Sequence, residues 1–222
     1  KDHNMMVPIL EGIHTINSYG IEVVSGIIMG LDTDKPETGE ALIAFVDETK
    51  IPLLTINLLQ ALPQTPLWDR LEREGRLIHD EGRDSNVDFR LPYEQVISSW
   101  RKCMEIAYQP ERLYARYQYQ CDYTYANRIK VPVTPEQKSW ANIKRALIML
   151  RNIFWKVGVL GDYRKVFWKF ALGRLRHGDI EGLIASTMIG HHLIMFARDA
   201  SEGQQNASNY SIRLREASVP AE

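Results

Sequence analysis

The sequence predicts an α/β N-terminal part with a parallel sheet, followed by an all-α C-terminal part. Two short apolar runs, at residues 22–29 and 53–59, have the composition of strands that are buried on both faces. Helical periodicity precedes the first run, separates the two and follows the second. From about residue 92 onward, every local signal is helical. Two successive βα units imply parallel strands joined by a right-handed crossover, and two strands alone do not make a stable sheet.

Helix signals in the N-terminal part place the boundaries of the elements. The first helix is expected over residues 5–19 and the second over 36–49, with Asp34 as its N-cap. A third helix begins at Pro66 after Thr65 as N-cap, and it ends near Gly75. The strands therefore alternate with helices along residues 1–78.

The remaining chain is expected to be helical up to a polar tail. A turn-rich linker covers residues 79–91, and a stiff connector covers 131–135. The expected helices span residues 93–107, 111–126, 135–157, 162–176 and 179–200, the last two with Asp162 and Asp179 as caps. The predicted division is 1–78 for the α/β part, 79–91 for the linker, 92–200 for the helical domain and 201–222 for a flexible tail.

The first strand carries two glycines near its carboxyl end, Gly26 and Gly30. Because glycine has no Cβ, a flat ligand or another backbone can approach the strand closely there. Ligands of α/β folds bind at the carboxyl ends of the strands. Asp32 follows the first strand and Gln60 follows the second, so both are candidate polar contacts. Packing alone explains the glycines equally well, and an ordinary βα loop explains Gln60 somewhat better than a ligand contact does.

Composition limits the classes of protein that the chain can belong to. A hydrophobic fraction of 45% and a charged fraction of 25% indicate a soluble globular protein. No unbroken apolar run reaches the ~18 residues that span a bilayer, and no secretory signal begins the chain. Cys103 and Cys121 lack metal-ligand spacing and indicate free thiols in the cytoplasm. The first residue is Lys and a helix follows almost at once, which favours a piece of a longer protein.

Charge is distributed unevenly, although the whole chain carries a net charge of only −1. Residues 138–176 contain ten basic side chains and one acid, a net charge of +9 that is interleaved with tryptophan and phenylalanine. This pattern indicates an anionic partner, with peripheral contact to an anionic membrane ahead of nucleic acid, which is not expected. A solvated basic face of a helical domain explains the pattern as well.

Two further groups of residues have structural explanations that outweigh functional ones. His191 and His192 lie about 100° apart on a helix, so they cannot chelate one metal ion together. Six tyrosines between residues 108 and 125 surround Arg112 and Arg116. Packing between helices explains the tyrosines better than a pocket for a bulky apolar substrate does.

The strand motif and the string LPQTPLWDRLEREGRL at residues 62–77 together resemble the later half of the barrel in cobalamin-binding radical S-adenosylmethionine (radical SAM) enzymes. Within that superfamily the chain is most similar to the hopanoid C-2 methylases, through residues 57–63, 117–120 and 152–158 among others. The resemblance covers nearly the whole chain. It implies a partial radical SAM barrel, a TIM-like parallel barrel, followed by an all-α C-terminal domain.

The resemblance also implies a cofactor site at the ends of the two strands. The glycine strand would contact the adenine of S-adenosylmethionine, and the loop after the second strand would flank it. The implied cofactor-binding residues are Gly26, Ile28, Gly30, Asp32, Gln60, Ala61 and Leu62. The family's acid is displaced here, because Thr33 takes its place and Asp32 precedes it.

The chain lacks the three-cysteine CxxxCxxC motif that binds a 4Fe–4S cluster, and it lacks a cobalamin-binding domain. The expectation is a C-terminal fragment that is inactive alone. The full-length enzyme would be a radical SAM C-methyltransferase that uses S-adenosylmethionine, a 4Fe–4S cluster and cobalamin to methylate an unactivated carbon of a hopanoid lipid. It would be cytoplasmic or peripheral on the inner membrane. The alternatives are the same scaffold with another substrate, and a non-enzymatic helical module that binds lipid or protein. The sequence assigns no catalytic residue.

Overall fold

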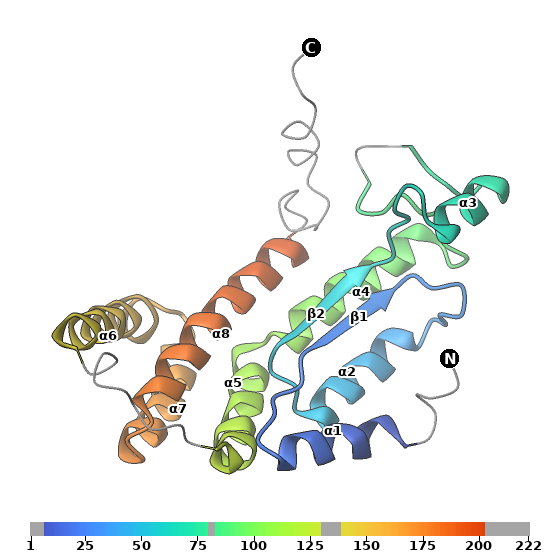
Figure 1. The fold of residues 1–222 in the computed structure, drawn as a ribbon. Coiled ribbons are helices and arrows are strands. Elements are labelled where there is room, and N and C mark those ends of the chain that lie inside the picture. The colour runs from blue at the N-terminus through green and yellow to red at the C-terminus, as the bar shows by residue number, and fades with distance from the viewer. Residues whose placement is uncertain (1–6, 80–82, 130–138, 203–222) are drawn as a thin grey trace. The chain divides into compact units, whose positions relative to one another are not determined.

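A computed structural model describes residues 7–79, 83–129 and 139–202 (Figure 1). The chain packs as two compact units. Among the described residues, the sheet unit consists of 25–45, 54–79, 83–107 and 196–202, and the helical unit consists of 7–24, 46–53, 108–129 and 139–195. These units combine segments that are separate in the sequence, so they do not follow the predicted boundary at residues 79–91. The predicted division into domains stays a prediction. The predicted connector at 131–135 and nearly all of the tail lie outside the described residues.

The sheet unit contains the two predicted parallel strands, β1 (Ser25–Met29) and β2 (Leu54–Leu58). The first strand begins three residues later than predicted, and the second is one residue shorter at each end. Gly26 pairs with Thr55 and Ile28 pairs with Asn57 in the register of the sheet. The described residues form no further strand of this sheet and no barrel. One face of β2 is buried, and the Trp100 indole N–H on α4 (Tyr93–Ala107) donates to the Ile56 carbonyl at 2.8 Å. That face is the core of the unit.

Two helices of this unit begin in different ways, and only one of them has the predicted cap. The helix α3 (Pro66–Arg73) begins as predicted, because the Thr65 hydroxyl accepts the Trp68 N–H at 3.3 Å. The prediction for α2 (Thr38–Thr49) was wrong at its start, since the helix begins two residues after Pro36. Asp34 does not cap it. The Asp34 carboxylate turns back and accepts the N–H groups of Gly30 and Leu31, at 2.7 and 3.1 Å.

The helical unit contains α1 (Ile9–Ser18), α5 (Pro110–Tyr119), α6 (Trp140–Ile153), α7 (Arg164–Arg176) and most of α8 (Ile180–Ser201). Single π-helical turns extend two of these helices, over Gln120–Thr124 and Phe154–Val159. The predicted Asp179 cap is confirmed, since its carboxylate accepts the Gly182 N–H at 2.9 Å. The helix α7 has Tyr163 rather than Asp162 at its N-cap position. Both Met5 and Met6 of the predicted first helix lie outside the described residues, and α1 starts after Pro8.

Tyrosine packing holds the helical unit together, as the sequence indicated. Tyr114 is buried, with its ring 5.2 Å from Phe170 and 6.2 Å from Tyr163 between centroids. Burial lowers the pKa of Arg116, inside the same unit, to about 10. The side chains of Tyr108 and Tyr117 are also buried. These residues therefore form a core and not a substrate pocket.

The helix α8 is long and apolar enough to cross a membrane by length and composition, and it is the one such helix among the described residues. Buried side chains on it, among them Leu183, Leu193 and Ile194, belong to the core of the fold. Core helices of soluble proteins meet the same criterion. Length and composition therefore do not by themselves make α8 a membrane span, and 39% of its apolar window is buried.

Candidate cofactor-binding site

One face of the two-stranded sheet is exposed, and no helix from the described residues of the sheet unit covers it. Because side chains alternate along a strand, Gly26 and Ile28 of β1 share this face with Thr55 and Asn57 of β2. The side chain of Ile28 is 48% exposed, which is high for an isoleucine in a strand. This open face combines a glycine gap, an apolar side chain and two polar side chains. It is suited to a flat, partly polar ligand.

The two glycines of the strand motif have different surroundings. A Cβ on Gly26 would meet only the Thr55 hydroxyl, at 3.6 Å, so the space above Gly26 is open. A Cβ on Gly30 would lie 2.4 Å from the Phe89 ring, and Gly30 has a φ of +92°. Gly30 is therefore required by the turn and by packing. Only Gly26 offers room to a ligand.

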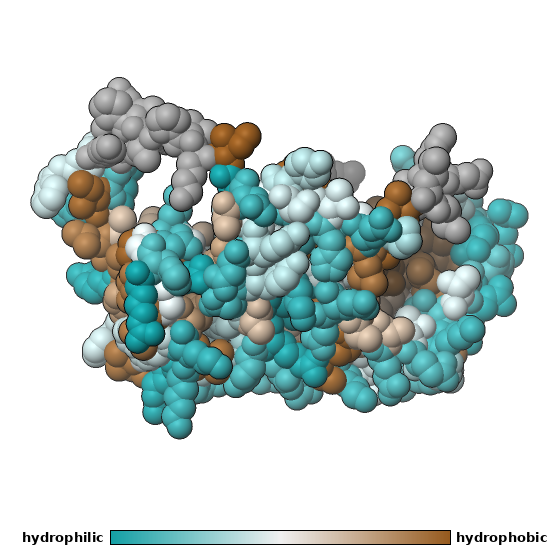
Figure 2. Space-filling model, turned by 90° about the horizontal axis from the view of Figure 1, so that it is seen from below, coloured by the Kyte–Doolittle hydropathy of each residue, from teal (hydrophilic) through white to brown (hydrophobic). Residues whose placement is uncertain are grey.

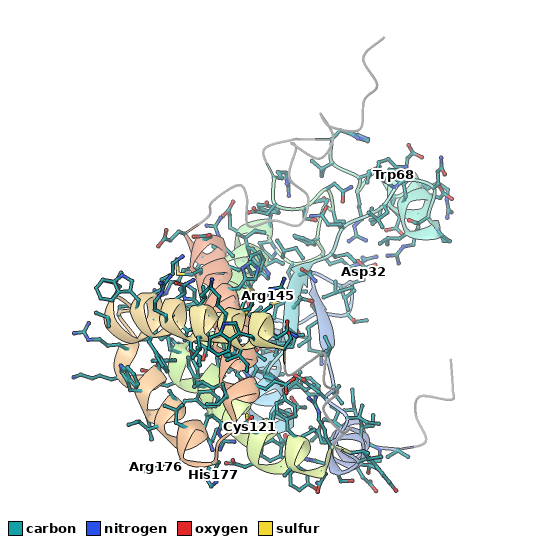
Figure 3. The ribbon with its side chains drawn as sticks, turned by 60° about the vertical axis from the view of Figure 1, so that its left-hand side comes forward. Asp32, Trp68, Cys121, Arg145, Arg176 and His177 are labelled. Carbon is teal, nitrogen blue, oxygen red and sulfur yellow. The ribbon has the colours of Figure 1, made fainter. Side chains whose placement is uncertain are left out.

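Asp32 lies just beyond β1 (Figure 3). Three arginines contact its carboxylate. Its carboxylate contacts Arg76 at 2.8 Å and Arg70 at 3.0 Å, with Arg90 at 3.7 Å. The hydrogen bond from Arg76 lowers the pKa of Asp32, and the charges of the three arginines add to that effect. Asp32 is thus ionised and already paired. Its visible role is to tie the loop after β1 to α3 and to the segment that follows α3.

Hydrogen bonds from two side-chain amides, those of Gln60 and Asn86, hold the loop after β2 in place. The Gln60 amide donates to the Asp84 carbonyl at 2.6 Å and accepts the Asn86 N–H at 3.3 Å. The Asn86 amide in turn accepts the Ala61 N–H at 2.9 Å and donates to the Ala61 carbonyl at 2.8 Å. Ser85 adds a hydrogen bond from its hydroxyl to the Leu59 carbonyl at 2.6 Å. The loop is therefore rigid, and the backbone of Ala61 is satisfied within the protein.

The residues of the predicted site fall into two groups, those that the protein's own contacts occupy and those that are exposed. Ala61 is 0% exposed and Gln60 is engaged by its neighbours, whereas Leu62 is 50% exposed. The structure thus brings the predicted residues of the two loops to the carboxyl end of the sheet, whereas Gly26 lies further back and pairs with Thr55 near the start of β2. Gly26, Ile28 and Leu62 are exposed. Sequence reasoning missed Thr55, Asn57 and Asn86. The alternation along the second strand could have found the first two, but nothing local marks Asn86.

The described residues contain no cluster of three or more histidines, cysteines or acids that could hold a metal ion. Cys103 and Cys121 are buried, and burial raises the pKa of Cys103 to about 11. His191 contacts the Tyr163 hydroxyl through Nδ1 at 2.6 Å. The residues present therefore do not fit a 4Fe–4S cluster. The cysteines are small core residues, as the sequence indicated.

The chain was compared with curated proteins, with solved structures and with protein-family models. The chain is 67% identical over all 222 residues to a hopanoid C-2 methylase of Rhodopseudomonas palustris, and it covers 42% of that protein. It is 28% identical over 183 residues to an uncharacterized methyltransferase of Synechocystis, covering 80% of this chain and 33% of that protein. The chain thus spans less than half the length of these curated relatives. No solved structure matches it significantly.

A family model, described as a domain of unknown function (DUF4070), matches residues 65–206. The matched segment begins at the cap of α3 and continues past the end of α8. It therefore covers well over half of the chain, including every helix that follows the sheet. The resemblance to hopanoid C-2 methylases expected from the sequence is confirmed by the similarity along the whole chain. This chain belongs to the DUF4070 family.

Proposed function

We propose that this chain is the C-terminal part of a cobalamin-dependent radical SAM methyltransferase that methylates a hopanoid lipid at an unactivated carbon. The observation that carries the proposal is the identity of 67% over all 222 residues to a hopanoid C-2 methylase. A relative named as a methyltransferase supports the reaction type. The parallel pair β1–β2 with one uncovered face supports a sheet that is completed by strands outside this chain, as in a TIM-like barrel.

The open sheet face fits the nucleoside of S-adenosylmethionine. Gly26 leaves a gap that a Cβ would fill, and Ile28 offers an exposed apolar surface beside it. Thr55 and Asn57 supply hydrogen-bonding groups on the same face. We assign the adenine to the space above Gly26, with Ile28 and Leu62 as apolar contacts. Gly30, Asp32, Gln60 and Ala61 hold the two loops in place.

The iron–sulfur cluster requires ligands that the described residues of this chain do not provide. When bound, S-adenosylmethionine, the iron–sulfur cluster and cobalamin supply the radical and methyl-transfer chemistry, while the protein positions them. The contribution of this chain is to orient the nucleoside and to exclude water from one side of it. We assign the enzyme to the cytoplasm, with peripheral contact to the inner membrane where a lipid substrate would reside.

Product analysis of the full-length enzyme tests the proposal. The anaerobically reconstituted enzyme is incubated with S-adenosylmethionine carrying a labelled methyl group and with a pentacyclic triterpenoid. We expect the label in a C-methylated triterpenoid, together with 5′-deoxyadenosine. The chain beginning at Lys1 serves as the comparison and should form neither product.

The two alternatives give different outcomes. A radical SAM enzyme with another substrate would form 5′-deoxyadenosine without labelling the triterpenoid. A non-enzymatic helical module would form neither product at full length. Replacing Gly26 by valine fills the proposed adenine gap, so this variant should raise the KM for S-adenosylmethionine.

A further inference from the structure

The helix α6 has more apolar surface than its packing within the helical unit uses. Its inner side is formed by Ala146, Leu150 and Ile153, which are half-buried or buried. Just beyond it, the Phe154 ring stacks on Trp168 of α7, with 5.4 Å between centroids. These contacts account for one side of the helix only.

The outer side of α6 is also apolar. Large hydrophobic side chains lie exposed there and on the π-helical turn that follows, with exposed fractions of 75% for Trp140, 57% for Leu147 and 60% for Trp155. Ile143, Ile148, Met149, Val159 and Leu160 are exposed as well. A large exposed apolar surface that the chain's own packing does not cover marks a site of interaction with a partner. We call this surface, residues 140–160, the α6 face.

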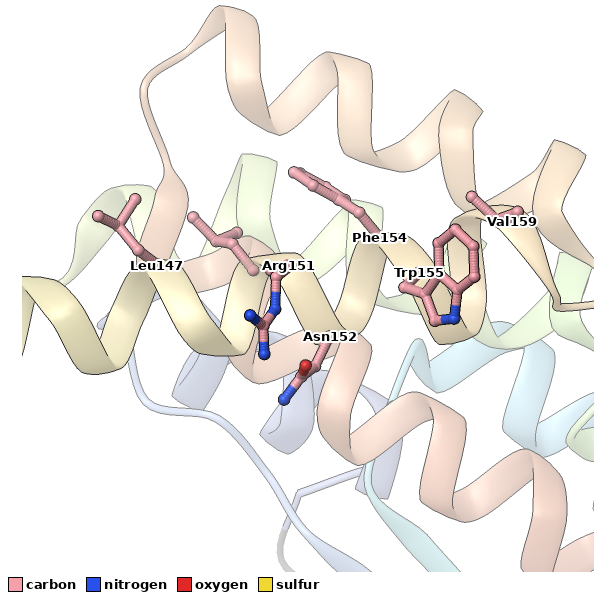
Figure 4. Close-up of a pocket in the computed structure, with 7 residues that line it drawn as sticks. Leu147, Arg151, Asn152, Phe154, Trp155 and Val159 are labelled. Carbon is pink, nitrogen blue, oxygen red and sulfur yellow. The ribbon is translucent and has the colours of Figure 1, made fainter.

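The α6 face is hollowed as well as apolar (Figure 4). An open pocket of about 730 Å³ lies where the packed and the exposed sides of the segment meet. It is lined by the half-buried Leu150 and Phe154 together with the exposed Leu147, Trp155 and Val159. Figure 4 shows the Arg151 guanidinium and the Asn152 amide extending from the opposite side of the helix to Leu147 and Phe154. In Figure 2 brown apolar patches interrupt the hydrophilic surface, including on the left, the side that carries α6 and α7 in Figure 1.

The charges on the α6 face are all positive. Residues 140–160 contain no acid and four exposed cations, Lys144, Arg145, Arg151 and Lys156. In the part of the chain that the structure describes, none of these four cations has an ion-pair partner. An occupant of this face must therefore be apolar and anionic at once.

We infer that the α6 face docks on an anionic phospholipid bilayer. Tryptophans at both ends of the segment suit the headgroup boundary, and the apolar row between them suits the acyl region below it. Lysine and arginine stems can lie along the apolar surface while their charged groups reach the lipid phosphates. Only the purpose of this docking, which is to bring a lipid substrate to the enzyme, rests on the proposed function.

Vesicle flotation of the full-length protein tests the inference. We expect binding to vesicles of phosphatidylcholine with phosphatidylglycerol, weak binding to phosphatidylcholine alone, and release at high salt. Replacing Lys144 and Arg151 by glutamine removes two cations and should weaken binding about 30-fold. The matched control replaces Lys102 and Arg73, two exposed cations of the sheet unit, and should change binding by less than about threefold.

Hydroxyl-radical footprinting of the same protein identifies what covers the face. Trp140 and Trp155 should be oxidised without vesicles and protected by anionic vesicles, while Trp100, which is 5% exposed, stays protected throughout. Two results would overturn the inference. One is binding that is unaffected by phosphatidylglycerol or by the paired substitutions, and the other is protection of Trp140 and Trp155 before vesicles are added. The second result would mean that another part of the protein covers α6. Formation of 5′-deoxyadenosine is measured separately, so failure of docking and failure of the proposed reaction are distinguishable.

Discussion

The loops at the carboxyl ends of β1 and β2 differ from the α6 face in how their polar and charged groups are used. In the loops, Asp32 is paired with arginines, and the amides of Gln60 and Asn86 are hydrogen-bonded to backbone. On the α6 face, Lys144 and Arg151 have no ion pair within the described residues, and large apolar side chains lie in solvent. The first region is built in advance and can hold a ligand in one orientation. The second requires a partner before its apolar surface and charges are satisfied.

The largest effect should come from replacing Gly30 by alanine. The φ of +92° is costly for alanine, and the added Cβ would lie 2.4 Å from the Phe89 ring. Together these terms should destabilise the protein by about 3 kcal/mol. Urea unfolding measures the loss. Gly26→Ala is the control, and it should be close to neutral because its Cβ meets only Thr55 at 3.6 Å. Equal losses at both positions would contradict the distinction drawn between the two glycines.

Asn86→Ala should have the next largest effect, because it leaves both backbone groups of the buried Ala61 without partners. We expect a loss of about 2–3 kcal/mol. In the full-length enzyme the KM for S-adenosylmethionine should rise as the loop loosens. The control is Asn127→Ala, which removes an exposed hydrogen bond from the Asn127 side-chain amide to the Tyr123 carbonyl. It should cost less than about 1 kcal/mol. A loss of stability no greater than that of the control would show that the loop after β2 does not depend on the hydrogen bonds of the Asn86 side chain.

Asp32→Asn should have a smaller effect that depends on pH. The pKa of Asp32 is lowered in the folded protein, so its contribution to stability is fully present above the unfolded pKa of about 4. The contribution is lost as the pH falls from there through the lower pKa of the folded state. Because the arginines are partly exposed, the variant should lose only about 1 kcal/mol at neutral pH. Urea unfolding at neutral and acid pH measures this. A difference between the two proteins that persists undiminished in acid would contradict the assignment to the ion pairs.

Leu147→Ser, on the α6 face, should have the smallest effect on stability. The side chain is largely exposed, so the free energy of unfolding should change by less than about 0.5 kcal/mol. The same variant should weaken binding to anionic vesicles. Leu150→Ser, at a half-buried position of the same helix, is the comparison and should cost more. A loss for Leu147 as large as that for Leu150 would indicate that the outer side of α6 is already packed.

Local sequence by itself determined the order and type of most elements. Periodicity and residue type predicted both strands, α4 to the residue, and the capped start of α3 at Thr65. These features depend on neighbours within a few residues, which is the range that periodicity and capping describe. The same signals predicted the alternation of strands and helices and hence the parallel pair. They also indicated an unusual density of cations and tryptophans around α6.

Only the tertiary structure decided which side chain forms a hydrogen bond or an ion pair with which partner. Asp34 has the residue type of a helix cap, yet its carboxylate binds the N–H groups of Gly30 and Leu31. Asp32 had the chemistry of a ligand contact, but arginines from 38, 44 and 58 residues further along the chain surround it. Asn86 meets Ala61 across 25 residues. No local pattern encodes these pairings, because the free energy of a hydrogen bond or an ion pair depends on groups that only the folded chain brings together.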